Sequence, residues 1–227
     1  MKIIDLLKRD TLSLSFEVFP PKKDSSFESV KAATEEIAAL KPAFMSVTYG
    51  AGGGTSRYTL DIVKNIKATY DIPVLEHLTC VSSTRETVRQ RIQEIKDAGI
   101  ENIMALRGDI PEGTDLSTRE SWDYNYATDL IRDLKESGAD FCIGGACYPE
   151  IHPESANQKE DIRHLKEKVE AGCHLDVQDT GSGHNRPGRC RYNAYHQRQS
   201  GGKVHTAFRF VHASEVQESG RQVRFRS

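Results

Sequence analysis

The sequence predicts an α/β fold of the (β/α)8 barrel type, with about five βα units present. Short apolar runs alternate five times with helix-like segments about a dozen residues long, a rhythm typical of a parallel sheet. An open doubly wound sheet would show the same rhythm. In a barrel, however, polar residues collect at the carboxyl ends of many strands. Such residues end the five runs here, which favours the barrel: Glu17, Thr48, His77, Arg107 with Asp109, and Tyr148.

Each predicted strand is a short apolar run bounded by turn-forming residues. The five runs lie at residues 14–19, 44–48, 73–79, 102–106 and 141–146. The helices between them are predicted from apolar residues at three- and four-residue spacing. Four are expected at residues 27–40, 56–68, 124–135 and 159–171. A fifth would be capped by Ser83 or Thr84 and closed by Gly99, where glycine adopts a left-handed conformation at little cost.

Composition limits the class and location of the protein. Its 227 residues are 37% hydrophobic and 28% charged, which suits one sizeable domain. The sequence contains no run of about 18 apolar residues, the length that a membrane-spanning helix needs. The apolar stretch at the N-terminus is too short for a signal peptide, because a charged residue, Asp5, interrupts it. We therefore expect a cytoplasmic protein. The five cysteines form no CxxC pair, and we therefore expect neither disulfides nor a metal site.

A change in composition after residue 173 predicts a boundary. Residues 174–227 hold nine Lys and Arg against four Asp and Glu, and five of the eight histidines of the chain. Because glycines, arginines and histidines are scattered there without an apolar period, we expect disorder. The chain is thus divided into a partial barrel domain, residues 1–173, and an irregular tail, residues 174–227.

Glu17 stands inside an otherwise apolar strand. A carboxyl group that faces a barrel mouth is partly desolvated, which raises its pKa and suits a general acid near neutral pH. A solvated glutamate on an exposed rim explains the pattern equally well.

Arg107, Gly108 and Asp109 follow the fourth strand. Their position predicts that Arg107 binds an anion or a flavin and that Asp109 places a charge beside the cofactor. The alternative is a local Arg107–Asp109 pair that stiffens the loop. The preceding strand and the composition disfavour an adhesion role for the RGD sequence.

Three further features suit a site without requiring one. The glycine-rich stretch 50–54 could bring backbone amides to a phosphate or form a plain flexible loop. His77 ends a strand, where a lone histidine is usually a satisfied structural residue. The loop 148–154 holds a ring, an imidazole and carboxylates between prolines that fix its course.

Taken together, five motifs resemble the methylenetetrahydrofolate reductase family, in its bacterial type without a regulatory domain. The motifs are SFEVFPP at 15–21, SVTYGA at 46–51, HLTC at 77–80, ALRGD at 105–109 and YPEIHPE at 148–154. They occur in the order and rough spacing of the family, and the resemblance covers about residues 14–173.

The resemblance implies a barrel that holds FAD at its mouth, takes a hydride from NAD(P)H and reduces 5,10-methylenetetrahydrofolate to 5-methyltetrahydrofolate. It implies that Glu17 is the general acid that opens the folate ring to the iminium, and that Asp109 lies beside both the flavin and the folate. Thr48 would meet the nicotinamide or the flavin. The positions that match FAD-lining residues are Thr48, Tyr49, Ala51, His77, Arg107, Gly108, Asp109, Tyr126, Ala127, Tyr148, His152, Asp161 and Lys168. The resemblance also implies a homo-oligomer, and nucleic acid is not an expected partner.

From His174 onward the sequence departs from the family pattern, and Gln178 matches the pterin-binding glutamine in count only. Recoding residues 203–225 with plausible codons, shifted by one base, gives a stretch that resembles a later part of the family. We hypothesise that the tail is an out-of-frame translation, which the nucleotide sequence around codon 173 would decide. A barrel without its last three strands exposes edges and apolar faces, so we expect marginal stability and weakened binding of FAD and folate.

Two other functions stay open on the residues alone. The first is a non-catalytic remnant or interaction module whose Arg-rich tail binds nucleic acid, which rests on charge alone. The second is a different (β/α) enzyme that shares the polar rim.

Overall fold

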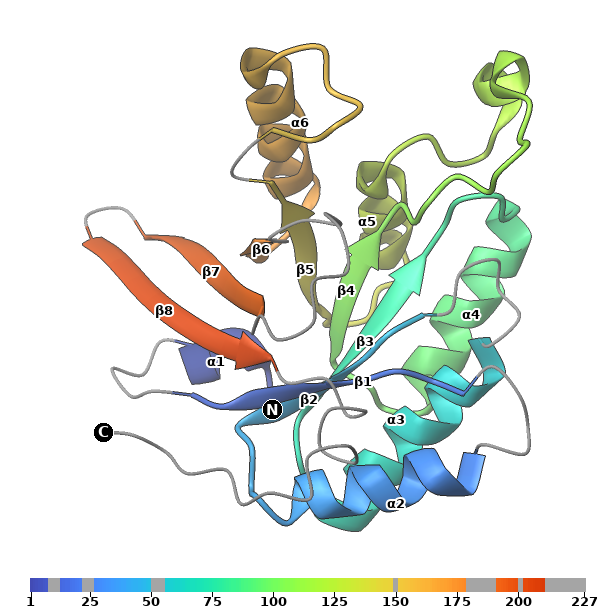
Figure 1. The fold of residues 1–227 in the computed structure, drawn as a ribbon. Helices are drawn as coiled ribbons and strands as arrows, with labels where there is room; N and C mark the ends of the chain where they lie inside the picture. Colours follow the sequence, from blue (N-terminus) through green and yellow to red (C-terminus); the bar gives the residue numbers. More distant parts are fainter. Residues whose placement is uncertain are drawn as a thin grey trace.

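The protein is built around a curved sheet that carries its longer helices on one side (Figure 1). The structure is a computed structural model, which describes residues 1–7, 13–21, 27–49, 56–148, 151–178, 191–199 and 202–210. No helix in these ranges is long and apolar enough to cross a membrane.

Five parallel strands follow one another across the sheet in chain order. They are β1 (Ser15–Val18), β2 (Phe44–Val47), β3 (Val74–Thr79), β4 (Asn102–Leu106) and β5 (Cys142–Cys147). Each pairs with the next in parallel, and their bounds lie within one residue of the predicted runs. Consecutive parallel strands joined by helices confirm the predicted α/β barrel-type fold with five βα units.

Three further strands continue the sheet beyond β5. β6 (Leu175–Gln178) pairs with β5 in parallel, whereas β7 (Arg191–Gln199) and β8 (Gly202–Phe210) form an antiparallel hairpin beside it. β8 also approaches β1, so the sheet curls back toward its first strand (Figure 1).

The strands β6, β7 and β8 differ from the irregular chain expected after residue 173. The hairpin has a sequence basis, because every second position of β8 is apolar or β-branched: Val204, Thr206, Phe208 and Phe210. The free edge of β6 offers backbone groups to which such a hairpin can bond. Residues 179–190 and 211–227 lie outside the described residues, and the boundary after residue 173 stays a prediction.

The helices cover the outer side of the sheet and enclose the main core with it. They are α2 (Phe27–Ala38), α3 (Ser56–Tyr70), α4 (Arg85–Asp97), α5 (Ala127–Glu136) and α6 (Gln158–Ala171). The first four each bury at least one apolar residue almost completely in this core, for example Ile37, Ile66, Ile95 and Leu130. These residues belong to the apolar stripes from which the helices were predicted.

The ends of α4 confirm two predicted boundaries. The side chain of Thr84 accepts a hydrogen bond from the backbone N–H of Thr87, so that Thr84 caps the helix. Gly99 follows the helix with a φ of +66°, the left-handed conformation expected of it.

α5 begins three residues later than the predicted start at residue 124. The side chain of Asp129 accepts hydrogen bonds from the backbone N–H groups of Asn125 and Tyr126, both at 3.0 Å. These bonds cap the helix and hold both residues outside it. Hydrophobic spacing carries no information about such a cap, because Tyr124 is apolar enough to extend the stripe.

A short helix that the sequence analysis missed, α1 (Ile3–Leu7), packs on the opposite side of the sheet. Ile3 and Leu6 form a second, smaller core with residues near the beginnings of four strands: Phe44, Leu75, Met104 and Cys142. The side chain of Asn102 accepts a hydrogen bond from the N–H of Ile3 at 2.8 Å. The five-residue helix is too short for its apolar spacing to be read as a period, so only tertiary packing reveals it.

Glu76 is a buried acid on the helix-covered face of the sheet. Its side chain is fully buried, and Oε1 accepts a hydrogen bond from Nη2 of Arg91 on α4 at 3.0 Å. Oε2 has no hydrogen-bond partner among the described residues. Burial raises the pKa of Glu76 to about 7, against the opposing effect of Arg91. The pair therefore joins β3 to α4 with a carboxyl group that is easily protonated.

We expect the stability that Glu76 contributes to decline as the pH rises from about 4.5 to about 7. Because the pKa is raised in the folded protein above its ordinary 4.5, the folded state binds more protons than the unfolded state across this window. The stabilising contribution is complete below the ordinary pKa of 4.5, and it is lost as the pH rises through the folded-state pKa of about 7. The decline should be on the order of 1 kcal/mol per pH unit.

Chemical denaturation of the wild type and of Glu76→Gln at several pH values measures this effect. The difference in free energy of unfolding between the two proteins should change with pH, because glutamine does not titrate. A difference that stays constant over this range would show that Glu76 is ionised throughout.

Candidate functional site

Glu17 and His77 meet on the face of the sheet opposite to the helices. Glu17 Oε1 lies 3.6 Å from His77 Nε2, and the two side chains are 21% and 13% exposed. Ser46, on the strand between them, pairs in register with Glu17, and its buried hydroxyl has no hydrogen-bond partner among the described residues. Alternation along each strand explains the arrangement, since the neighbours of these residues point into the helix-covered core.

His77 is uncharged at neutral pH in this position. Burial lowers its pKa to about 4. It therefore adds no positive charge beside the Glu17 carboxyl group, and their contact is not an ion pair near pH 7. Of the two interpretations of Glu17 left open by the sequence, the structure favours the partly enclosed carboxyl group over the solvated one.

The end of β2 is held by backbone contacts. Thr48 donates its N–H to the carbonyl of Val18 at 3.0 Å, and its own carbonyl accepts the hydroxyl of Thr59 at 3.1 Å. Tyr49 is partly buried against the main core. Ala51 and the glycine-rich stretch 50–54 lie outside the described residues, so their predicted roles stay predictions.

The loop that follows β4 begins with a tightly held turn. The carbonyl of Arg107 accepts the backbone N–H groups of Cys80 and Val81 at 3.1 and 2.8 Å. Gly108 follows with a φ of +89°, and a Cβ atom there would lie 2.9 Å from Cγ1 of Val81. Asp109 is exposed, and its charge contributes to the raised pKa of Arg107. The turn thus fixes the backbone from which the Arg107 side chain extends.

Arg107 forms its main ion pair with Glu154, in the loop after β5. Nη1 and Nη2 donate to the two carboxylate oxygens at 2.6 and 2.5 Å. Nη1 of Arg119 lies 3.8 Å from the same carboxylate. The local Arg107–Asp109 pair considered from the sequence is therefore not the dominant contact, since the hydrogen bond to Glu154 is the main cause of the raised pKa of Arg107 and the charge of Asp109 is a smaller one.

A cavity of about 110 Å³ opens between the end of β5 and α6. Four residues predicted to line the cofactor surround it: Tyr148, His152, Asp161 and Lys168. The rings of Tyr148 and His152 meet edge to face, with centroids 4.6 Å apart. Lys168 donates to the carbonyl of Ala146 at 2.7 Å, which holds its chain along the cavity wall.

Tyr126 presents its ring at the start of α5, where it is 44% exposed. The ring stacks on the imidazole of His164 on α6, with ring centroids 4.8 Å apart. The guanidinium of Arg119 lies 5.5 Å from the centroid of the Tyr126 ring. Ala127, the next residue, is buried. Tyr126 therefore belongs to the surface between α5 and α6, close to the loop that carries Arg119.

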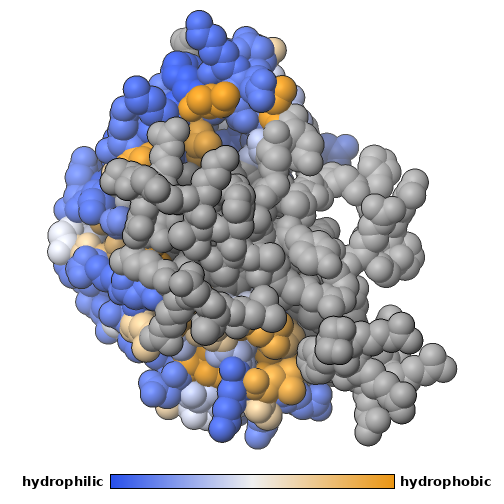
Figure 2. Space-filling model, turned by 90° about the vertical axis from the view of Figure 1, so that its left-hand side faces the viewer, coloured by the Kyte–Doolittle hydropathy of each residue, from blue (hydrophilic) through white to orange (hydrophobic). Residues whose placement is uncertain are grey.

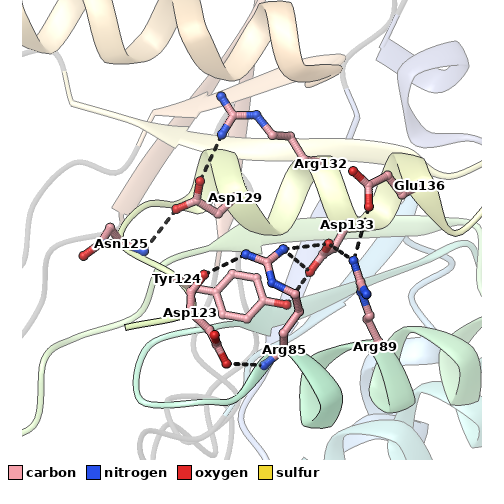
Figure 3. A network of polar contacts seen from close by, with 9 residues as sticks. All are labelled: Arg85, Arg89, Asp123, Tyr124, Asn125, Asp129, Arg132, Asp133 and Glu136. Carbon is pink, nitrogen blue, oxygen red and sulfur yellow. Dashed lines mark hydrogen bonds and ion pairs between the residues drawn. The ribbon is translucent and has the colours of Figure 1, made fainter. Parts of the chain in front are cut away.

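A buried carboxylate anchors the segment just before Tyr126 (Figure 3). The side chain of Asp133 is 1% exposed and accepts hydrogen bonds from Nη1 of Arg85 at 3.1 Å and from Nη2 of Arg89 at 3.1 Å. The hydroxyl of Tyr124 also donates to it. Burial and this hydrogen bond raise the pKa of Tyr124, which stays protonated.

Arg85 also binds Asp123, which directly precedes Tyr124 in the chain. Nη2 donates to the carbonyl of Asp123 at 3.0 Å, and the backbone N–H of Arg85 donates to the Asp123 carboxylate at 2.8 Å. The guanidinium also lies 5.1 Å from the centroid of the Tyr124 ring. The network joins α4, α5 and the end of the loop after β4, so it fixes where that loop returns to the fold (Figure 3).

On the face shown in Figure 2, the coloured surface is largely hydrophilic, with apolar residues in a few separate groups. On α6, Ile162 and Val169 are 58% and 44% exposed, and none of its described residues is buried. α6 therefore borders the cavity without burying an apolar face of its own.

Three residues of this region were not predicted from the sequence: Arg119, Glu154 and His164. Glu154 belongs to the quoted motif 148–154, so a search of that motif for a partner of Arg107 could have found it. Arg119 and His164 carried no such signal, because their contacts join segments that are distant in the chain.

The sequence profile of methylenetetrahydrofolate reductases matches residues 2–178. The chain belongs to the methylenetetrahydrofolate reductase family. The resemblance drawn from five motifs is thereby confirmed, and the matched range includes every predicted site residue.

Curated relatives agree with the family assignment. Enzymes named 5,10-methylenetetrahydrofolate reductase from Pectobacterium carotovorum subsp. carotovorum, Salmonella typhimurium and Escherichia coli are each 39% identical to the chain over 166 residues. The match covers 73% of this chain but 53%, 54% and 54% of those proteins. The chain thus spans about half the length of the curated relatives it matches.

A solved structure supports the fold alone. A crystal structure of 2,3-dimethylmalate lyase, a PEP mutase/isocitrate lyase superfamily member, matches with a TM-score of 0.50 at 10% identity. The match covers 78% of this chain and 61% of that one.

Replacing Asp133 should destabilise the protein strongly. Asp133→Asn removes the charge that two arginines and Tyr124 share, and we expect a loss on the order of 3 kcal/mol in the free energy of unfolding. Glu136→Gln is the control, because the Glu136 carboxylate pairs with Arg89 at the surface. It should change little. Urea denaturation compares the two, and equal losses would contradict the anchoring role.

Replacing Gly108 should cost more than replacing another glycine with a similar backbone. Gly108→Ala brings a Cβ atom within 2.9 Å of Val81, whereas at Gly113, with a φ of +80°, a Cβ atom would meet nothing within 4 Å. Both variants carry the strain of a positive φ, so their difference isolates crowding. We expect Gly108→Ala to lose roughly 1–3 kcal/mol more in denaturation experiments. Equal losses would show that the turn relaxes freely.

Proposed function

We propose that the chain carries the site for FAD-dependent reduction of 5,10-methylenetetrahydrofolate to 5-methyltetrahydrofolate, with NAD(P)H as the hydride donor. The observation that supports it best is the placement of Glu17. Its carboxyl group lies beside an uncharged imidazole on the inner face of the sheet. The rim that follows the strands carries Arg107 and the cavity beside β5. Because the chain spans about half the length of its curated relatives, the activity of the whole enzyme is part of the proposal.

The residues present fit a flavin dinucleotide. The hydroxyl of Ser46, near Glu17, is buried and has no hydrogen-bond partner in the part of the chain that the structure describes, and a flavin ring edge could supply one. Arg107 supplies a guanidinium suited to phosphate. The cavity is smaller than the roughly 300–1,000 Å³ of typical ligand pockets, so it would hold one portion of a dinucleotide and leave the rest along the rim.

The binding residues fall into two groups. Tyr148, His152, Asp161 and Lys168 line the cavity. Tyr126 and Ala127 lie at the start of α5, where the Tyr126 ring stacks on His164 of α6. Thr48, Tyr49, Ala51, His77, Arg107, Gly108 and Asp109 would meet the cofactor from the ends of β2, β3 and β4. When bound, FAD would supply hydride transfer between NAD(P)H and the folate.

The two carboxylates have separate tasks in this proposal. Glu17 donates a proton to the folate so that its five-membered ring opens to the iminium. Asp109 sets the charge beside the reacting groups, where its exposed carboxylate can approach a ligand. The cytoplasmic location and the homo-oligomer stay predictions, as do the out-of-frame origin of the tail and the weakened cofactor binding. The Arg-rich tail as a nucleic-acid-binding segment also stays a prediction, because its side chains lie outside the described residues.

Glu17→Gln should separate the two halves of the reaction. The variant should bind FAD and accept reduction by NADH or NADPH, because neither step needs the proton of Glu17. Reoxidation by 5,10-methylenetetrahydrofolate should slow by about 100-fold or more, the usual loss for a general acid. The visible absorbance of the flavin follows both steps under anaerobic conditions.

Glu160→Gln is the matched control, because the Glu160 carboxylate pairs with Arg163 at the surface at the start of α6. It should leave both half-reactions unchanged. A wild-type protein that remains colourless with excess FAD would contradict the proposed function. A Glu17→Gln variant that is reoxidised at the wild-type rate would reject the role of Glu17 alone.

A further inference from the structure

The segment 123–126 carries the chain from the loop after β4 into the first turn of α5. Asp129 of α5 holds its second half, because Oδ2 accepts the backbone N–H groups of Asn125 and Tyr126, both at 3.0 Å. Arg85, at the start of α4, holds its first half (Figure 3). Two residues from two different helices therefore fix the course of this short segment.

Arg85 binds the segment and a buried acid of α5 at the same time. Its Nη2 donates to the carbonyl of Asp123 at 3.0 Å, and its backbone N–H donates to the Asp123 carboxylate at 2.8 Å. Its Nη1 donates to both carboxylate oxygens of Asp133, at 3.1 and 3.3 Å. Because a guanidinium group is planar and presents its N–H donors in a fixed fork, these bonds set the position of Asp123 relative to Asp133.

The ring of Tyr124 makes the segment follow this position. Tyr124 is 1% exposed, its hydroxyl donates to Asp133, and the guanidinium of Arg85 lies 5.1 Å from its ring centroid. A buried ring of this size cannot shift without disturbing the close packing around it. Tyr126 follows two residues later, so its ring is placed relative to the position that Arg85 gives to Asp123 and Tyr124.

Arg89 offers a comparison within the same network. Its Nη2 also donates to Asp133, at 3.1 Å, and to Glu136 at 3.3 Å. Both acids lie within α5, and Arg89 lies within α4. The bonds from Arg89 thus join the two helices, whereas those from Arg85 also reach the segment 123–126.

We propose that Arg85 is a positioning residue for ligand binding, which sets the place of the Tyr126 ring at the edge of the flavin site. It acts through Asp123 and Tyr124 and does not itself touch the ligand. The inference rests on the proposed function for the identity of the ligand, since Tyr126 is one of the residues proposed to meet FAD. The ring is 44% exposed beside His164 of α6, so a ligand can reach it.

The test separates the position of the segment from the stability of the fold. Arg85→Lys keeps a cation beside Asp133, but an ammonium group cannot hold Asp133 and the Asp123 carbonyl in one rigid fork. Arg89→Lys is the matched control, because it makes the same change at the same carboxylate. Each substitution is made in the wild type and in Tyr126→Ala. Urea denaturation gives the stability, and flavin fluorescence gives the dissociation constant of FAD.

The two lysine variants should lose similar stability but differ in binding. In the wild-type background, Arg85→Lys should weaken FAD by about tenfold, the ratio that corresponds to ~1.4 kcal/mol. In Tyr126→Ala the same change should alter the affinity by no more than about twofold, because its effect passes through the missing ring. Arg89→Lys should leave the affinity within about twofold in both backgrounds.

Asp123→Ala is a milder second variant, in case Arg85→Lys does not fold. It removes the carboxylate that accepts the backbone N–H of Arg85 at the surface, and it leaves the bonds to Asp133 in place. It should weaken FAD several-fold in the wild-type background and leave the affinity of Tyr126→Ala unchanged.

Trp122 reports on the segment without any ligand. It is the single tryptophan of the chain and directly precedes Asp123. Arg85→Lys should make its fluorescence more accessible to quenching by acrylamide, because the following residues are held less firmly. Arg89→Lys should leave the quenching as it is in the wild type.

Three outcomes would overturn the inference. One is an unchanged affinity for FAD in both Arg85→Lys and Asp123→Ala. Another is an equal loss of affinity with and without the Tyr126 ring, which would make Arg85 a structural residue only. The last is quenching of Trp122 that is the same in both lysine variants. If quenching differs as expected but no protein binds FAD, the placement of the segment by Arg85 stands and the proposed function fails.

Discussion

The alternation of side chains along the five parallel strands is the constraint on which the rest of this structure depends. Each strand sends every second side chain into the core beneath the helices and the others to the opposite face. Register between neighbours then decides which polar residues meet there. Glu17 and His77 come together because both occupy that face on strands that flank β2. A shift of one residue in the pairing would bury both in the helix-covered core instead.

Burial gives the acids of this protein different tasks. Asp133 is enclosed but receives hydrogen bonds from two arginines and a tyrosine, so it acts as an anchor. Glu76 is equally enclosed, accepts a hydrogen bond only from Arg91 among the described residues, and has its pKa raised by burial to about 7. Glu154 is also bound by an arginine, but its side chain is 44% exposed, so water solvates it as well. The degree of enclosure and the number of donors separate the three roles.

Much of the fold could be predicted because its elements have strong periods of their own. The five strands fall within one residue of their predicted bounds, and the cap of α4 follows from Thr84. The failures have physical causes as well. α1 is too short to show a period, and the start of α5 depends on hydrogen bonds to Asp129. The hairpin of β7 and β8 shows an alternation that is obscured by its many polar residues.

The sequence by itself determined the family, the order of the βα units and most of the residues at the rim, because each of these is written in local motifs. Only the tertiary structure decided which of those residues touch. It paired Arg107 with Glu154 rather than with Asp109, added Arg119 to the pair, and left His77 uncharged beside Glu17. Such contacts join segments that are distant in the chain, and their charges depend on burial. Local sequence patterns reveal neither which distant residues make contact nor how deeply each is buried, because both arise when the sheet brings separate loops to one edge.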